Sequence, residues 1–152
     1  MIEQSTGTPL DLIRHRRAEL REAMGGVESA LAAPAPGRAA AWAEQAGVAL
    51  GQLHSDFAEH IAVTEGPDGL YTDVLASAPR LSNAIRRLGA EHTQIAADLN
   101  AIAERMTSVA SQEDVEDVRT ATTNLLARLV RHRQRGADLV FEAYQVDVGG
   151  ET

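Results

Sequence analysis

The sequence predicts an all-α fold, an antiparallel up-down-up-down bundle of four helices. Four long segments place apolar side chains at steps of three and four residues, which is the spacing of one helix face. Short connections that contain proline, glycine or serine separate these segments, so neighbouring helices are expected to run in opposite directions. No segment shows the apolar–polar alternation of a strand, and no internal repeat is visible.

Composition predicts one domain over residues 1–152 with an aliphatic core. Apolar residues make up 44% of the chain and aromatic residues only 3%. The net charge of −8 argues against a nucleic-acid partner, because the chain could not neutralise a phosphate backbone. The absence of cysteine excludes disulfides, iron–sulfur clusters and thiolate zinc sites. No apolar run approaches the ~20 residues of a membrane span and no signal peptide is visible, so we expect a cytoplasmic protein without a membrane partner.

The first helix is expected to begin after Thr8 and Pro9, with threonine as N-cap and proline at the first helical position. The segment 34–37, which contains two prolines and a glycine, ends this helix. Its apolar stripe consists of Ile13, Leu20, Met24, Val27 and Leu31.

The second helix is expected to run from about residue 38 to about residue 65. The Gly-Pro-Asp-Gly segment 66–69 then interrupts the chain, because proline cannot donate within a helix and glycine weakens one. Residues 70–76 favour a helix again, either as a kinked continuation or as a short separate piece. Ala78 and Pro79 form the next break.

The third helix is expected to extend from about residue 80 to Met106. Ser111 is the expected N-cap of the fourth helix, with Asp114 at its third position in an approximate capping box. The fourth helix is expected to reach about Tyr144, and the polar, glycine-containing tail 145–152 is expected to be loose.

Three histidines, His60, His92 and His132, stand in the middle of the apolar stripes of the second, third and fourth helices. A neutral imidazole buried without a partner costs roughly 1–3 kcal/mol. Counting residues from the turns, at a rise of ~1.5 Å per residue, places the three rings near one level of the bundle. Each ring alone could be a satisfied core histidine. Three at one level favour ligation of a metal ion, because imidazole is the commonest metal ligand.

The first helix could add a fourth histidine at this level, because His15 lies at a comparable distance from its turn. The apolar stripe, however, puts Arg17 on the inward face and His15 almost opposite. A rotation of the first turns would bring His15, Glu19 and Glu22 inward together. Both orientations remain open at this point.

A histidine of this kind falls in each predicted helix, at His15, His60, His92 and His132, and the fifth histidine, His54, flanks the stripe of the second helix. This arrangement resembles the hemerythrin-like family, also called the HHE cation-binding domain. The Glu91–His92 pair before an apolar stripe, Leu129–His132 and the segment 64–71 also look like that family, and the resemblance covers nearly the whole chain. It implies non-haem iron, one or two ions held by histidines and carboxylates, which carries or senses oxygen, nitric oxide or peroxide.

The carboxylates of that family are incompletely matched. The family places one four residues after its second histidine, where this chain has Thr64, and Glu65 follows it. In a regular helix Glu65 would not face the site, but the Gly66–Pro67 break or a π-bulge could turn it inward. In the fourth helix Gly136 and Ala137 stand where a carboxylate is expected. A single ion, an asymmetric pair and an empty site therefore all remain open.

We expect a hemerythrin-like iron protein whose open coordination position admits a small diatomic molecule or peroxide. The expected metal ligands are His60, His92, His132, His15 and Glu65. Glu91 is expected to be solvated, and Gly136 either leaves room for a ligand or lets helices approach. No general base, phosphate loop or nucleophile triad is visible, so binding or sensing is favoured over turnover. Two alternatives stay open: a metal-free four-helix interaction module, and a peroxide-degrading or oxidative enzyme.

Overall fold

The computed structural model describes residues 9–146, which are entirely helical apart from their connections and contain no strand. The four long helices are α1 (Pro9–Ala32), α2 (Ala39–Glu65), α4 (Ser82–Met106) and α5 (Gln112–Val140). The short elements are α3 (Leu70–Ser77), the 3₁₀ turn η1 (Pro79–Leu81) and the π-helical turn η2 (Phe141–Val146). The predicted all-helical fold with four long helices is confirmed.

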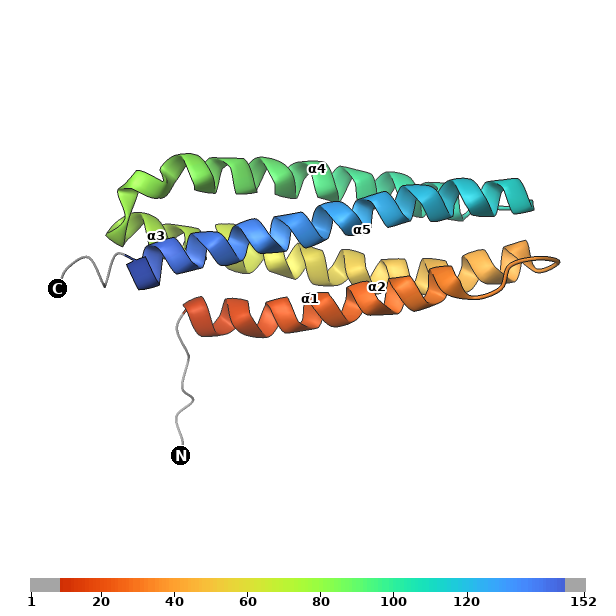
Figure 1. Ribbon diagram of the computed structural model, residues 1–152, viewed down its shortest axis with the longest axis horizontal. Coiled ribbons are helices and arrows are strands. Elements are labelled where there is room, and N and C mark those ends of the chain that lie inside the picture. Colours follow the sequence, from red (N-terminus) through yellow and green to blue (C-terminus); the bar gives the residue numbers. More distant parts are fainter. Residues whose placement is uncertain (1–8, 147–152) are drawn as a thin grey trace, which may run out of the picture.

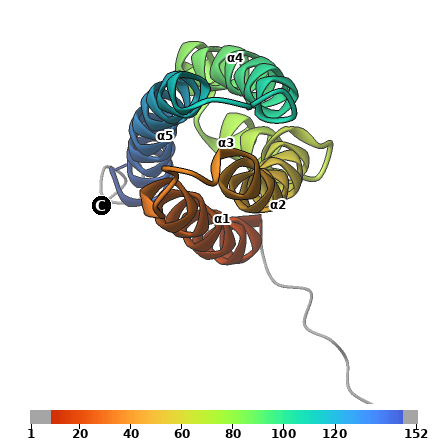
Figure 2. The same ribbon diagram turned by 90° about the vertical axis from the view of Figure 1, so that its right-hand side faces the viewer.

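The four long helices lie side by side along the longest axis of the molecule (Figure 1). The α1–α2 loop and the α4–α5 turn lie at one end, and α3 lies at the other end. Seen from one end, the helices surround a common interior (Figure 2). Within the described residues, no helix is long and apolar enough to cross a membrane.

Several helix ends follow the sequence signals. The Asp114 amide donates to Ser111 Oγ at 3.1 Å, and the Ser111 amide donates to Asp114 Oδ2 at 3.1 Å, so the predicted capping box is confirmed. Gly69 has no room for a side chain, because a Cβ there would lie 2.7 Å from the Val63 carbonyl oxygen. The backbone is extended at Gly66 (ψ 164°) and at Gly69 (ψ −176°), so α3 is a separate helix and not a continuation of α2.

Two end predictions have a different outcome. The expected N-cap Thr8 lies outside the described residues, although α1 does begin at Pro9. The chain does not leave the helix at residue 145, because η2 extends to Val146. The remaining tail, 147–152, lies outside the described residues.

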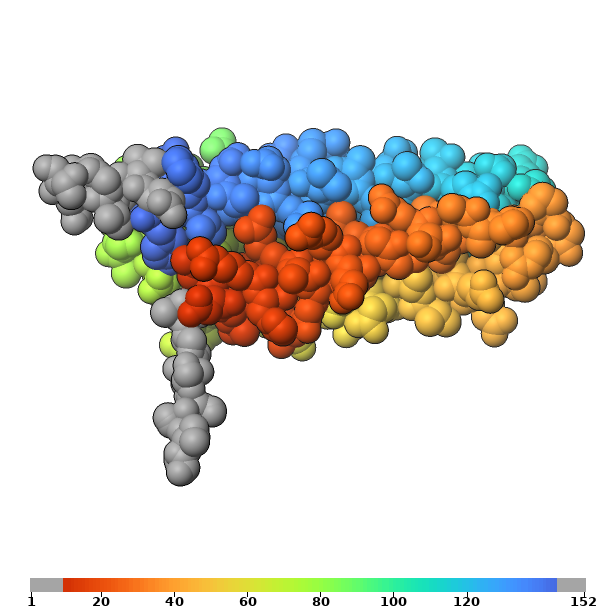
Figure 3. Space-filling model, turned by 60° about the horizontal axis from the view of Figure 1, so that its bottom comes forward, coloured from red at the N-terminus to blue at the C-terminus, as the bar shows by residue number. Residues whose placement is uncertain are grey.

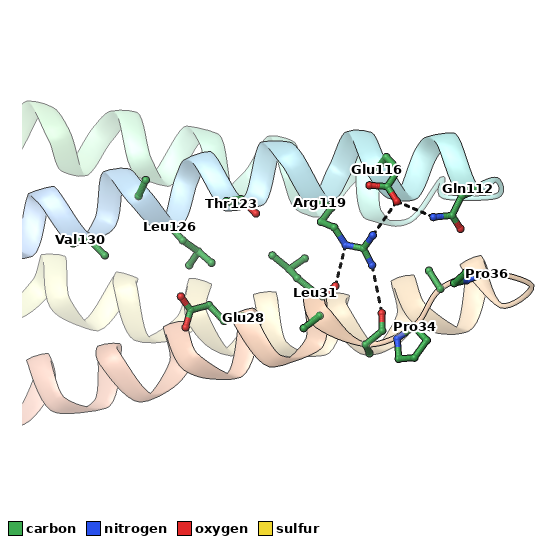
Figure 4. A pocket seen from close by; sticks show the side chains of 14 residues that line it. Glu28, Leu31, Pro34, Pro36, Gln112, Glu116, Arg119, Thr123, Leu126 and Val130 are labelled. Atoms are coloured by element: carbon green, nitrogen blue, oxygen red, sulfur yellow. Dashed lines mark hydrogen bonds and ion pairs between the residues drawn. The ribbon is translucent and has the colours of Figure 1, made fainter.

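Arg119 of α5 joins the far end of α1 to the bundle (Figure 4). Its guanidinium donates to the carbonyl oxygens of Leu31 at 3.0 Å and Ala33 at 3.4 Å, and it lies 5.3 Å from the ring centroid of Trp42. The Leu31 carbonyl belongs to the last turn of α1 and the Ala33 carbonyl follows that helix directly, where a helix end leaves acceptors unpaired. In the space-filling view, α1 follows α5 from this end towards its own N-terminus (Figure 3).

The interior consists of two apolar clusters. The larger includes Leu20, Trp42, Leu53, Phe57, Ile95, Leu99, Leu125 and Leu129. The smaller includes Ile13, Leu70, Tyr71, Val74, Leu88 and Leu139. Buried or half-buried polar side chains also come from each long helix, among them Arg17 of α1, His60 of α2, His92 of α4 and His132 of α5. We call these four residues the polar layer.

Candidate metal centre

The three histidines of the polar layer converge inside the bundle. His60 on α2, His92 on α4 and His132 on α5 are only 6%, 1% and 2% exposed. Each ring offers one nitrogen to the centre, and these three nitrogens all lie within 4.8 Å of one another. The helical stripes place the rings on inward faces, and the packing of α2, α4 and α5 brings those faces together. The predicted meeting of these rings at one level is thus present in the structure.

Two carboxylates hold the outer sides of two rings. His92 Nδ1 lies 2.5 Å from Glu65 Oε2, and His132 Nδ1 lies 2.7 Å from Glu91 Oε1. An ionised carboxylate only accepts hydrogen bonds, so in each pair the Nδ1–H donates. The neutral ring then keeps its lone pair on Nε2. This carboxylate–histidine arrangement is the one that orients metal-binding imidazoles in proteins.

The inner nitrogens are incompletely satisfied. His132 Nε2 lies 3.3 Å from His60 Nε2, whereas His92 Nε2 and His60 Nδ1 are buried without a hydrogen-bond partner. Two nitrogens about 2.0–2.1 Å from a tetrahedral ion would be about 3.4 Å apart. The His60–His132 separation therefore suits two ligands of one ion. An ion would also satisfy the free lone pair of His92.

The electrostatic environment keeps the rings neutral. Burial, followed by the neighbouring histidines, lowers the pKa of both His60 and His92 to about 3. Burial also lowers the pKa of His132, although Glu91 opposes this shift. Neutral imidazole is the form that binds a metal. The cluster is therefore in its ligating form at neutral pH.

The structure does not bring the fourth predicted histidine to the cluster. The His15 side chain is 67% exposed, and its Nε2 lies 3.3 Å from Glu19 Oε2. Ile13 and Leu20 are buried, and the helical repeat between them turns Arg17, not His15, towards the cavity that His60 and His132 line. The alternative in which α1 rotates His15, Glu19 and Glu22 inward is not the one adopted.

Glu65 reaches the site in a different way from the one expected. Its carboxylate contacts a candidate ligand, His92, on the outer nitrogen, and its side chain is 40% exposed. Among the residues that the structure describes, the convergent ligand atoms come from the three histidines. Glu65 lies at the last position of α2, next to the Gly66 break, which lets it reach across to α4. Thr64, at the position of the family carboxylate, is buried and donates to the His60 carbonyl oxygen at 2.8 Å.

Glu91 corrects the expectation of a solvated side chain. Besides His132, it contacts Arg135, whose Nη1 donates to Glu91 Oε2 at 2.8 Å. One signal in the sequence could have revealed it. Arg135 stands three residues after His132, on the adjoining part of α5, so a carboxylate from α4 at this level meets both a ring N–H and a cation.

A small cavity of about 20 Å³ lies beside the cluster. Its lining includes His60, His132, Tyr71 and Gly136, together with Arg17 and Arg133. A Cβ built on Gly136 would meet nothing within 4 Å, so this glycine leaves open space. Tyr71 stacks on His92 with ring centroids 5.9 Å apart and planes at 11°. The cavity exceeds the ~10–15 Å³ that one water molecule needs.

Comparison of the chain with protein-family models, curated proteins and solved structures finds no match. The residues of the site themselves indicate which ion it could hold. Three neutral imidazoles, two of them held by carboxylates, fit a divalent transition-metal ion such as Fe²⁺, Zn²⁺, Cu²⁺ or Ni²⁺.

Proposed function

We propose that the protein binds one transition-metal ion through His60, His92 and His132 and uses it to bind or sense a small molecule. In keeping with the resemblance to hemerythrin-like domains, we propose non-haem iron as the metal and oxygen, nitric oxide or peroxide as the ligand. We also propose that the four long helices run in up-down-up-down order. We propose a single ion in place of the iron pair of that family. Among residues 9–146, no carboxylate converges with the three histidines to hold a second ion.

The observation that carries this proposal is the arrangement around His92. Its Nδ1 contacts the Glu65 carboxylate at 2.5 Å, while its buried Nε2 has no hydrogen-bond partner. A neutral core histidine would need a donor at this nitrogen, since an unsatisfied buried acceptor costs about 1–3 kcal/mol. A metal ion removes this penalty.

The charges of the neighbourhood suit a divalent ion. The three ligands are neutral, and the carboxylates of Glu65 and Glu91 lie one ring away from the inner nitrogens. They offset two positive charges without occupying a coordination position. An ion held by three protein nitrogens supplies Lewis acidity and keeps at least one position open for an exogenous ligand. The cavity beside His60 and His132 provides the space for such a ligand.

Metal analysis combined with thermal unfolding tests this function. Protein purified from its native host should contain about one equivalent of iron per chain, and a chelator should lower Tm because the ion binds only the folded state. If another metal fills the site completely, the proposal of iron is wrong, but the proposal of a metal site stands. If the protein contains no metal, and if added Fe²⁺, Zn²⁺ or Co²⁺ leaves Tm unchanged, the metal-free interaction module is the correct alternative. Oxygen evolution from peroxide would favour the enzymatic alternative.

A further inference from the structure

Two arginines line the cavity beside the histidine cluster without an acidic partner. Arg17 comes from α1 and Arg133 from α5, and both line the cavity of about 20 Å³ that His60 and His132 also line. Among the residues that the structure describes, no carboxylate pairs with either guanidinium, and Arg133 Nε is buried without a hydrogen-bond partner. Neighbouring arginines do find partners: Arg16 binds Glu19, and Arg135 binds Glu91.

The two guanidiniums share one environment with the rings. Burial, then the charges of Arg17 and Arg21, lowers the pKa of Arg133. The charges of Arg17 and Arg133 are also among the causes that lower the pKa of His60. Arg17 and Arg133 line the same cavity as His60, so the two guanidiniums lie close to one another and to the cluster. Half-buried like charges that repel each other are unfavourable unless something negative binds between them.

We propose that Arg17 and Arg133 form a binding site for a small inorganic anion of two or three atoms, at the cavity next to His60 and His132. Peroxide anion, superoxide, nitrite and azide belong to this class. The site deepens the proposed metal-binding function and rests on it, since the anion would occupy the open side of the ion.

Size and charge together define the ligand class. A cavity of about 20 Å³ exceeds the space that one water needs but excludes a carboxylate-bearing metabolite or a nucleotide phosphate. Charge-assisted hydrogen bonds from guanidinium favour an anion over a neutral diatomic molecule. The carboxylates of Glu65 and Glu91 do not oppose this, because they lie on the outer nitrogens of His92 and His132 and do not line the cavity.

The test measures azide binding and metal content in the same preparations. The variants are Arg17→Gln, Arg133→Gln and their double variant, and Arg131→Gln is the control because Arg131 is exposed on the same helix. In metal-loaded protein, followed by visible absorption of the Co²⁺ form, each site variant should bind azide at least about tenfold more weakly. Arg131→Gln should bind azide within about twofold of wild type, and sulfate should not compete.

Metal-free protein separates this inference from the metal proposal. Azide should still raise the Tm of wild type, and it should raise the Tm of the double variant much less. Without azide, the double variant should melt at or above wild type, because removing two unpaired charges relieves repulsion; this also shows that the variant folds. If the protein binds no metal but azide still stabilises wild type more than the double variant, the proposed function is wrong and the anion site stands. Equal azide affinity, or equal azide-induced stabilisation, in wild type and double variant overturns the anion site.

Discussion

Glu65 Oε2 lies 2.5 Å from Nδ1 of His92, although the two residues belong to different helices and are 27 positions apart. Glu65 ends α2, and His92 stands in the middle of α4. The contact fixes which nitrogen of His92 carries the proton and therefore which one faces the cluster. The same pattern recurs between Glu91 and His132 at 2.7 Å. Two carboxylates thus prepare two rings for ligation from the outside.

Replacing Glu65 by glutamine should weaken metal binding by about 10–100-fold, because the amide keeps the shape but loses the charge that orients and polarises His92. Helical content by circular dichroism should not change. Glu44→Gln is the matched control, since Glu44 is exposed on the same helix. Equal metal affinity of both variants in a competition titration would show that Glu65 has no role at the centre.

Alanine at His60, His92 or His132 should each remove most of the bound metal, because two imidazoles seldom retain an ion that three hold. His15→Ala is the control, and it should keep full metal content because His15 is exposed and contacts Glu19. The measurement is metal per chain after exhaustive dialysis. Loss of metal in His15→Ala would instead place α1 in the rotated orientation.

Gly136→Ala should narrow the cavity without disturbing the ion. The added methyl meets nothing within 4 Å, so the helix should gain up to about 1 kcal/mol from the better helix former. The same methyl takes part of the cavity of about 20 Å³, so azide should bind more weakly to the metal-loaded variant. Gly51→Ala in α2 also meets nothing within 4 Å and should stabilise the fold without affecting azide. Unchanged azide affinity in Gly136→Ala would show that azide does not bind in this cavity.

Acid should destabilise the metal-free protein through its buried histidines. The pKa of His60 and of His92 is about 3 when folded, against about 6.5 when unfolded. The unfolded chain therefore binds more protons between these values. The stabilisation is fully present above pH 6.5 and is lost progressively as the pH falls towards 3. Between pH 6 and 5 the free energy of unfolding should fall by about 1.2 kcal/mol for each of these two histidines.

Urea unfolding at several pH values measures this slope. His92→Phe should remove the contribution of one of the three histidines whose pKa is lowered and should leave the rest of the slope. In metal-loaded protein, the metal signal and the helical signal should be lost over the same acidic range, since protonated imidazoles cannot bind an ion. A flat dependence of stability between pH 6 and 5 would show that the rings are protonated or solvated in the fold.

The sequence by itself determined the helices and the inward position of the three histidines. Steps of three and four residues assign a face, and the buried rings of His60, His92 and His132 lie on the assigned faces. Local signals also determined the Ser111–Asp114 capping box and the chain break at Gly66–Gly69. The same periodicity favoured Arg17 over His15 as the inward residue of α1, and the exposure of His15 agrees with it.

Only the tertiary structure decided which side chains surround those rings. Periodicity gives a direction around one helix axis, but it does not say how far a flexible side chain reaches or which helix it meets. Glu65 and Glu91 contact histidines 27 and 41 positions away, because the packing of α2, α4 and α5 sets their relative height and rotation. The meeting of Arg17 and Arg133 at one cavity has the same origin, since α1 and α5 lie far apart in the sequence and only the closed bundle brings them together.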